Sequence, residues 1–209
     1  MTNDAKFHVA RHSERELYDR SAINQLLDNQ YVAHVGFIDQ DNQKPFVIPM
    51  GFARDNDRIL LHGSTGSRLM RQIAQGIDLC VTVTQLNAIV VARSAFNSSM
   101  NYESVMIFGI ARVLEDSEKD MALERITEKL VPGLWNYGRP LASKEIAATL
   151  IVELSLDKVS AKSREGDPSD DEEDLALPIW AGLLPIESKV GKPITAANSA
   201  AIAVPPHIA

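Results

Sequence analysis

The sequence contains very little cysteine, since Cys80 is the only one among 209 residues. A single cysteine excludes an internal disulfide. Its place in LCVTV, with no cationic neighbour, predicts a buried strand thiol rather than a reactive one. The sequence also lacks any run of about 18 apolar residues, and its N-terminus lacks the apolar core of a signal peptide. We therefore expect a cytoplasmic protein that has no membrane-spanning helix.

Sequence signatures of common catalytic and metal sites are missing as well. No Cys/His cluster has zinc-ligand spacing, and no G-x-S-x-G nucleophile elbow occurs. The five carboxylates of residues 170–174 lack the glycine and the spacing of an EF-hand loop, so we interpret them as a solvated loop. His34 alternates with apolar strand residues and is interpreted as a core histidine. We predict no metal site and name no catalytic residue.

The charge balance narrows the classes of partner. A net charge of −7 argues against nucleic acid and anionic membranes, which bind basic surfaces. Much of this charge lies in residues 170–174, so the rest of the chain is nearly balanced and can still hold a phosphate site. With 45% hydrophobic residues, we predict one domain over residues 1–187 and an extended or flexible tail over residues 188–209.

Periodicity predicts a mainly β fold with peripheral helices. Strands are expected at residues 31–38, 45–53 and 58–62, and later at 78–85, 88–96 and 102–114, with a bend at Gly109. Helices are expected from a capping box at Ser13 and Glu16 to Asp28, from about residue 67, from 118 to 130 after a Ser117 cap, and from Ser143. Short polar turns favour antiparallel pairing, and this order of elements favours a small barrel over an alternating α/β sheet.

The segment LHGSTGSR, residues 61–68, is the most informative local motif. A strand ends there in small residues and hydroxyls and leads into a helix that carries Arg68 and Arg71. Amide groups at a helix start, hydroxyls and a guanidinium can together cradle a phosphate dianion. An ordinary strand-to-helix turn with a solvated arginine remains the alternative, because no Walker lysine follows.

Three other segments are candidates for lining a site. The proline in residues 46–50 breaks one ladder hydrogen bond, which leaves amide groups for a flat ring or marks a simple bulge. Tyr102 and Ser104 share one strand face, which looks into a pocket or into solvent. Trp180 lies in an apolar segment between prolines and must pack on the core edge, a ligand or a partner subunit.

Several of these segments occur together in one known family. YDRSAINQLLDNQYVAHVGFIDQDNQKPFVIPMGFARDNDRILLHGSTGSRLM, ARSAFNSSMNYESVMIFGIARVLED and SAKSREGDPSDDEEDLALPIWAGLLPI resemble the pyridoxamine 5′-phosphate oxidase-related flavin-nucleotide-binding proteins, over residues 15 to 187. The resemblance implies an antiparallel Greek-key split β-barrel that binds flavin mononucleotide (FMN). It also implies a homodimer with two cofactors between the protomers.

The resemblance further implies a set of site residues. The isoalloxazine ring would lie on Val47, Ile48, Pro49 and Met50, and the ribityl phosphate on His62, Gly63, Ser64, Ser67 and Arg68. Ser104 matches the position where the oxidases carry a glutamine beside the flavin, with Asn101 and Tyr102 next to it, and Trp180 would close over the site from the other subunit.

The chain departs from the oxidases at two positions. Leu69 follows Arg68 where the oxidases have a lysine, and the chain ends in AIAVPPHIA instead of a basic tail. We therefore expect flavin binding without vitamin B6 oxidation.

Two functions follow from a bound flavin. The first is an FMN-dependent oxidoreductase of a small molecule, such as a nitro or quinone compound, because the flavin ring itself carries electrons and hydride. The alternative is a non-catalytic module that stores or senses flavin. Haem binding is a third interpretation, which would need His34 or His62 as an axial ligand.

Overall fold

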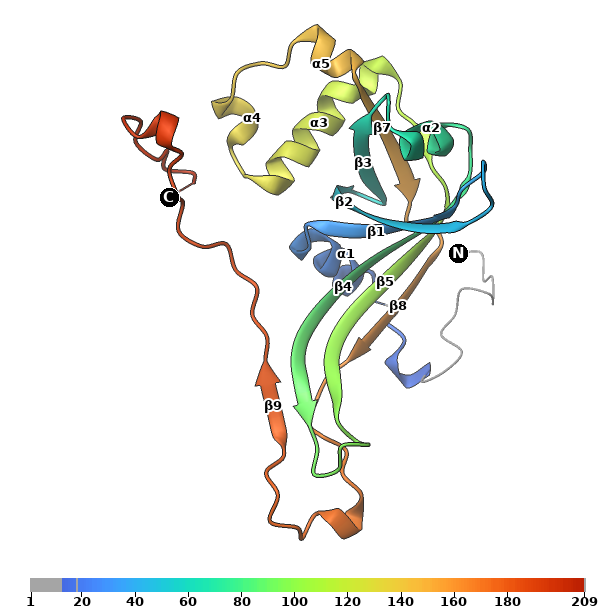
Figure 1. Cartoon of the computed structure of the whole chain (residues 1–209), viewed down its shortest axis with the longest axis vertical. Coiled ribbons are helices and arrows are strands. Elements are labelled where there is room, and N and C mark those ends of the chain that lie inside the picture. The colour runs from blue at the N-terminus through green and yellow to red at the C-terminus, as the bar shows by residue number, and fades with distance from the viewer. Residues whose placement is uncertain (1–12, 18, 209) are drawn as a thin grey trace.

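The computed structural model, which describes residues 13–17 and 19–208, is built around an antiparallel sheet that curls into a half-barrel (Figure 1). The strand order is β6-β7-β3-β2-β1-β4-β5-β8, and β9 pairs with β4 outside this path. The strands are β1 Val32–Ile38, β2 Pro45–Asp55, β3 Arg58–Ser64, β4 Asp78–Val91, β5 Ser99–Ile110, β6 Arg112–Val113, β7 Thr149–Ser155, β8 Val159–Arg164 and β9 Gly182–Pro185. The predicted fold, a mainly β split barrel with peripheral helices, is confirmed.

The helices lie around this sheet and are short, apart from α1 and α3. They are α1 Arg20–Asn29, α2 Arg68–Ala74, α3 Asp116–Leu130, α4 Leu134–Tyr137 and α5 Ser143–Ala147, with 3-10 turns at Ser13–Arg15, Glu172–Asp174 and Ala197–Ser199. The buried residues form two clusters. The larger fills the half-barrel and includes the apolar stripe of α1, whereas the smaller lies between the β2-β3-β7 sheet and α3.

The predicted start of the first helix, at Ser13, is wrong. The helix begins at Arg20, where the side chain of Asp19 accepts a hydrogen bond from the amide of Ser21 at 3.0 Å. Upstream, Leu17 N donates to Ala161 O at 2.9 Å and Glu16 forms a bridge with Lys162. This segment therefore pairs with β8, and tertiary pairing overrides the local capping-box pattern.

The start of α3 also differs from the prediction, because Glu115 and not Ser117 occupies the N-cap. Glu118 accepts a hydrogen bond from the amide of Glu115 at 2.9 Å, which is one half of a reciprocal capping box. The helix consequently begins at Asp116, two residues earlier than expected.

The two strands predicted at residues 78–85 and 88–96 are one strand, β4, with a register shift between Leu86 and Ala88. The bulge lets β4 continue in the same ladder with β5. Figure 1 shows β4 and β5 curving together into a long arm. Residues 92–96 lie beyond the end of β4, because the chain turns there toward β5. The arm also carries β9, which pairs with Ala88 to Val91.

The bend expected at Gly109 is confirmed as the place where the chain changes partner strands. Residues up to Ile110 pair with β4, whereas Arg112 and Val113 pair with β7. Gly109 has a φ of 151°, and a Cβ there would lie 3.2 Å from Leu154. Glycine is therefore required both by the backbone conformation and by the close approach of the two layers.

Residues 170–174, interpreted from the sequence as a solvated loop, are not wholly exposed. They follow β8, which ends at Arg164, and the side chain of Asp170 is only 3% exposed. Asp170 accepts hydrogen bonds at 2.7 Å from both the backbone amide and the guanidinium of Arg93. The interpretation of residues 170–174 as a solvated run is thus wrong for Asp170, which anchors the loop to the end of the arm.

The C-terminal segment runs from β9 back toward α4 (Figure 1). Val190 is 83% exposed and Ile194 is 96% exposed, so apolar side chains of this segment face solvent in one chain. Near its end, the ring of His207 lies 5.1 Å from that of Tyr137. Across the described residues, no helix is both long and apolar enough to span a membrane.

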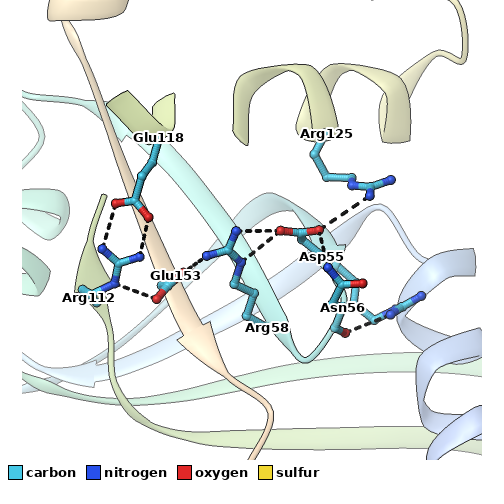
Figure 2. Close-up of polar contacts among 8 residues, drawn as sticks. Asp55, Asn56, Arg58, Arg112, Glu118, Arg125 and Glu153 are labelled. Atoms are coloured by element: carbon cyan, nitrogen blue, oxygen red, sulfur yellow. Dashed lines mark hydrogen bonds and ion pairs between the residues drawn. The ribbon is translucent and has the colours of Figure 1, made fainter. Parts of the chain in front are cut away.

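An ion-pair network joins α3 to the β2-β3-β7 sheet (Figure 2). Arg112 donates to Glu153 at 2.7 Å and makes two hydrogen bonds of 2.8 Å with Glu118. Arg58 pairs with Glu153 and, at 2.7 Å, with Asp55. The guanidinium of Arg112 and the amide of Glu115 lower the pKa of Glu118 from 4.5 to about 2.

We predict that protonation of Glu118 in acid weakens this network and so lowers the free energy of unfolding. A lowered folded-state pKa means that Glu118 stabilises the fold above pH 4.5, and that this contribution is lost between pH 4.5 and pH 2. The E118Q variant should be less stable than the wild type at pH 7 and should lose less stability over this pH interval, as measured by urea unfolding. The control is E124Q, on an exposed part of the same helix. Equal losses in E118Q and the wild type would contradict the prediction.

Candidate functional site

The half-barrel is split because the two halves of β2 pair with different strands. Residues 45–51 pair with β1, whereas residues 52–55 pair with β3. Beyond the pair Phe52–Leu61, β3 continues alongside β7 and leaves β2. Among the described strands, none pairs with the edge of residues 45–51 that faces away from β1. A gap in the hydrogen-bonded ladder, which we call the opening, therefore lies between this edge of β2 and the end of β3, and the amide groups along it are not used by a ladder.

The Gly/Ser turn after β3 forms the corner of this opening, and it uses much of its own hydrogen-bonding capacity. Thr65 N donates to Ala148 O at 2.9 Å, Gly66 N to Ser64 Oγ at 3.1 Å, and Ser67 N to Ser64 O at 2.9 Å. Ser67 also caps α2 through the amide of Met70. The amide groups of residues 65–67 are thus already used within the fold, although Ser64 and Gly66 remain exposed.

Gly63 has a structural explanation. A Cβ at this position would lie 2.7 Å from Cγ of Met70, which is 1% exposed in the core. Glycine at residue 63 therefore lets α2 pack closely on the end of β3. The residue helps to place the corner, whether or not a ligand contacts it.

Arg68 is the cation at the corner, and its guanidinium is already paired. It forms an ion pair with Asp39, lies 3.5 Å from Asp41, and stands 5.8 Å from the ring centroid of Phe46. These contacts join the start of α2 to the β1–β2 turn and to β2. The Arg68 side chain is nevertheless 50% exposed, so an anion can reach it from solvent.

Asp39 is a buried carboxylate that holds this arrangement together, with its side chain 2% exposed. It accepts hydrogen bonds from Gln72 at 3.1 Å and from the amide groups of Asp41 and Asn42 at 3.1 and 3.2 Å. Burial alone would raise the pKa of Asp39, but the hydrogen bonds from Arg68, Asn42 and Gln72 hold it below its usual value. From the sequence this segment is predicted only as a polar turn and Asp39 is not identified, because only its tertiary partners distinguish it from other turn aspartates.

The four residues predicted to lie against a flavin ring divide between two faces of β2. Val47, which is 65% exposed, and Pro49 pair with Gly36 and His34 and share their outward face. Ile48 and Met50 instead pack against the large core cluster. His34 is exposed, so its interpretation as a core histidine is wrong.

His62 lies at the end of β3, beside the opening, on the face that carries Leu60. Its Nδ1 atom is buried and has no hydrogen-bond partner among the described residues. Burial lowers the pKa of His62, which favours the neutral imidazole. The ring therefore has an unused nitrogen and no charge near neutral pH.

Tyr102 and Ser104 lie on the outward face of the sheet, but Asn101 does not. Ser104 is paired with Thr84, two residues along β4 from Thr82, which pairs with His34. Asn101 is 4% exposed; it donates to Gly166 O at 3.0 Å and accepts from Arg164. It therefore secures the loop after β8, on the opposite face of β5 from the two other residues.

Within one chain, the predicted site residues form two separate groups. β2 and β5 are separated by β1 and β4, so these two strands lie three strand spacings apart, about 14 Å. Ser104 is also displaced along β5 from Phe108, the residue that lies across the sheet from Val47. Trp180 is 63% exposed and precedes Gly182, which pairs with Val91. Cys80 pairs with Gly36, which in turn pairs with Val47 of β2. Val91 lies eleven residues farther along β4 than Cys80, which is roughly 35 Å of strand. One chain alone does not bring the tryptophan to the opening.

The outward face of these strands carries apolar side chains that no element of the described chain covers. We call this surface the open sheet face; its exposed apolar residues include Val32, Ile38, Val47, Leu86 and Met106. This surface was not predicted from the sequence. Exposed apolar residues on one face of several adjacent strands indicate a surface that another molecule covers.

Comparisons with known proteins were made for the whole chain. The family model described as pyridoxamine 5′-phosphate oxidase matches residues 19–163, more than half of the chain. The flavocytochrome Anf3 from Azotobacter vinelandii is 38% identical, with a TM-score of 0.90 over 97% of this chain and 94% of that one. The FAD- and haem-binding protein from Mycobacterium smegmatis is 37% identical, with a TM-score of 0.89 over 93% of this chain and 95% of that one. No curated protein matches.

Proposed function

Because this chain belongs to the pyridoxamine 5′-phosphate oxidase family, we propose that it is a flavin-binding redox protein whose cofactor lies across the opening between β2 and β3. The resemblance stated from the sequence is thereby confirmed. The proposal rests on two features that lie at the same opening. They are the edge of β2 that pairs with no described strand and the half-exposed side chain of Arg68. Such an edge offers amide groups to a planar ring, and the guanidinium offers charge to a phosphate.

The flavin we propose is flavin adenine dinucleotide (FAD). The sequence predicted FMN, but the Mycobacterium smegmatis relative, at 37% identity over nearly the whole chain, is named for FAD. When bound, the flavin supplies the electron and hydride chemistry. The residues of this chain bind and orient it. Arg68 holds a phosphate, the edge of residues 45–51 meets the ring, and Val47 offers an apolar contact.

We predict that R68A weakens the binding of FAD and FMN about tenfold or more, because a charge-assisted hydrogen bond contributes roughly 1.5–3 kcal/mol. Riboflavin, which has no phosphate, should bind the variant and the wild type equally. Quenching of flavin fluorescence on titration measures all three affinities. R125A, which removes an arginine of α3 that is 56% exposed, is the control. Wild-type affinity of R68A for both nucleotides would rule out the Arg68 corner as the phosphate site.

The separation of the site residues supports a homodimer. Trp180 and Ser104 lie far from the opening of their own chain, whereas a second copy seated on the open sheet face would bring its own residues toward it. The face carries several exposed apolar side chains among polar ones and is uncovered by the described residues, as a subunit interface is before assembly. We therefore assign the open sheet face to contact with a second copy.

Met106 provides a test of this dimer. M106E would place a carboxylate on the open sheet face of each copy, where burial and repulsion between equal charges oppose association. Sedimentation equilibrium should give the mass of two chains for the wild type and of one chain for M106E. M121E makes the same change at an exposed methionine of α3 and should remain dimeric. A dimeric M106E would show that the interface lies elsewhere.

Haem binding is the second candidate function, and His62 favours it. Both close structural relatives are named for haem or as a flavocytochrome. Haem iron is typically held by a neutral imidazole, and burial beside apolar Leu60 and Ile151 lowers the pKa of His62 and so favours that form. We propose that His62, rather than the exposed His34, would hold the haem iron. A bound haem would supply one-electron redox chemistry, which favours a redox role over flavin storage.

We expect H62G to lose most bound haem while it keeps flavin affinity. Haem content from the reduced pyridine complex, and the position of the Soret band, provide readouts that do not depend on turnover. Added imidazole should restore haem to H62G, because it supplies the missing ligand without changing the fold. H34G, the matched control, should retain haem with an unchanged Soret band. Loss of haem from H34G but not from H62G would reverse the assignment.

A further inference from the structure

At the Arg68 corner the guanidinium contacts more carboxylates than it can neutralise. One guanidinium faces two carboxylates: the buried Asp39, and Asp41 at 3.5 Å, whose side chain is 75% exposed. Leu69, at the next position, adds no cation. The local sum over Arg68, Asp39 and Asp41 is thus one net negative charge.

This arrangement is held in place by several contacts. Gln72 donates to Asp39 at 3.1 Å and accepts from the amide of Gln40 at 3.2 Å. The amides of Asp41 and Asn42 also donate to Asp39. Because the β1–β2 turn is tied to α2 in this way, the Asp39 carboxylate is fixed behind Arg68, and the backbone of Asp41 is held so that its exposed side chain stays within reach of the same guanidinium. An arriving phosphate therefore meets the charge of both carboxylates as well as that of the arginine.

The two flavin nucleotides differ in the charge that they place at such a corner. The terminal phosphate of FMN is a monoester, which carries a charge of about −1.5 to −2 at pH 7. In FAD the same phosphate belongs to a diphosphate diester, so each phosphate carries a single negative charge. Repulsion by a carboxylate grows with the charge of a phosphate and falls with its distance. The FMN monoester places its whole charge at the corner, whereas FAD places one charge there and the second farther away, so the repulsion acts more strongly on FMN.

We propose that Asp39 and Asp41 make the Arg68 corner selective for a flavin dinucleotide over a flavin mononucleotide. This inference rests on the proposed function, since it requires a flavin phosphate at Arg68. Asp39 contributes a fixed charge behind the guanidinium, and Asp41 contributes one at the solvent side. Arg68 remains the anion contact, while the two carboxylates set which phosphate it accepts.

The decisive variant is D41N, because Asp41 is exposed and its loss leaves the buried contacts of Asp39 in place. Titration of flavin fluorescence at low ionic strength should show FMN binding about fivefold tighter in D41N than in the wild type, with FAD changed by less than about twofold. In 0.5 M salt the difference should shrink, because exposed charges are screened. D120N, which removes an exposed carboxylate from α3, should change neither affinity.

D39N should shift selectivity in the same direction, provided that its thermal unfolding shows a folded protein. D41N keeps the test valid if D39N does not fold. An unchanged ratio of FMN to FAD affinity in D41N, with R68A still weakening both nucleotides, would overturn the selectivity inference and leave the proposed function standing. Wild-type affinities in R68A would instead remove the phosphate site itself.

Discussion

The exchange of partner strands along β2 is the constraint on which the rest of the structure depends. One half of this strand belongs to the β1-β4-β5 side of the sheet and the other half to the β3-β7 side. Because β3 leaves β2 after the pair Phe52–Leu61, the edge of residues 45–51 has no second partner strand, and the half-barrel opens there. The turn after β3, the start of α2 and His62 all lie around this opening because β3 ends there.

Charge then determines what the opening can hold. The β1–β2 turn and α2 meet through Asp39, Arg68 and Gln72, and this contact secures the corner without closing it, because Arg68 stays half exposed. The same contact places two carboxylates beside the guanidinium of Arg68. At this corner the arginine attracts a phosphate, and the carboxylates repel a phosphate more strongly when it carries more negative charge.

The strand pattern was well predicted wherever local chemistry decides structure. Alternation and short polar turns predicted the antiparallel meander, and Gly109 was identified at the change of partner strand because a bend there needs a residue without a side chain. Errors arose where distant groups decide the outcome. The first helix begins at Arg20 because the preceding segment pairs with β8, and the bulge at residues 86–88 joins two predicted strands because β5 continues beside both.

The sequence by itself determined the family, the mainly β barrel and the residue types at the opening, because periodicity, turn residues and ordered motifs are local properties of the chain. Only the tertiary structure decided which of these residues meet. It separated Asn101 from Tyr102 and Ser104, placed Trp180 at the far end of the arm, and paired Arg68 with Asp39. The physical reason is that burial, ion pairing and strand separation depend on the positions of residues distant in sequence, which no local pattern contains.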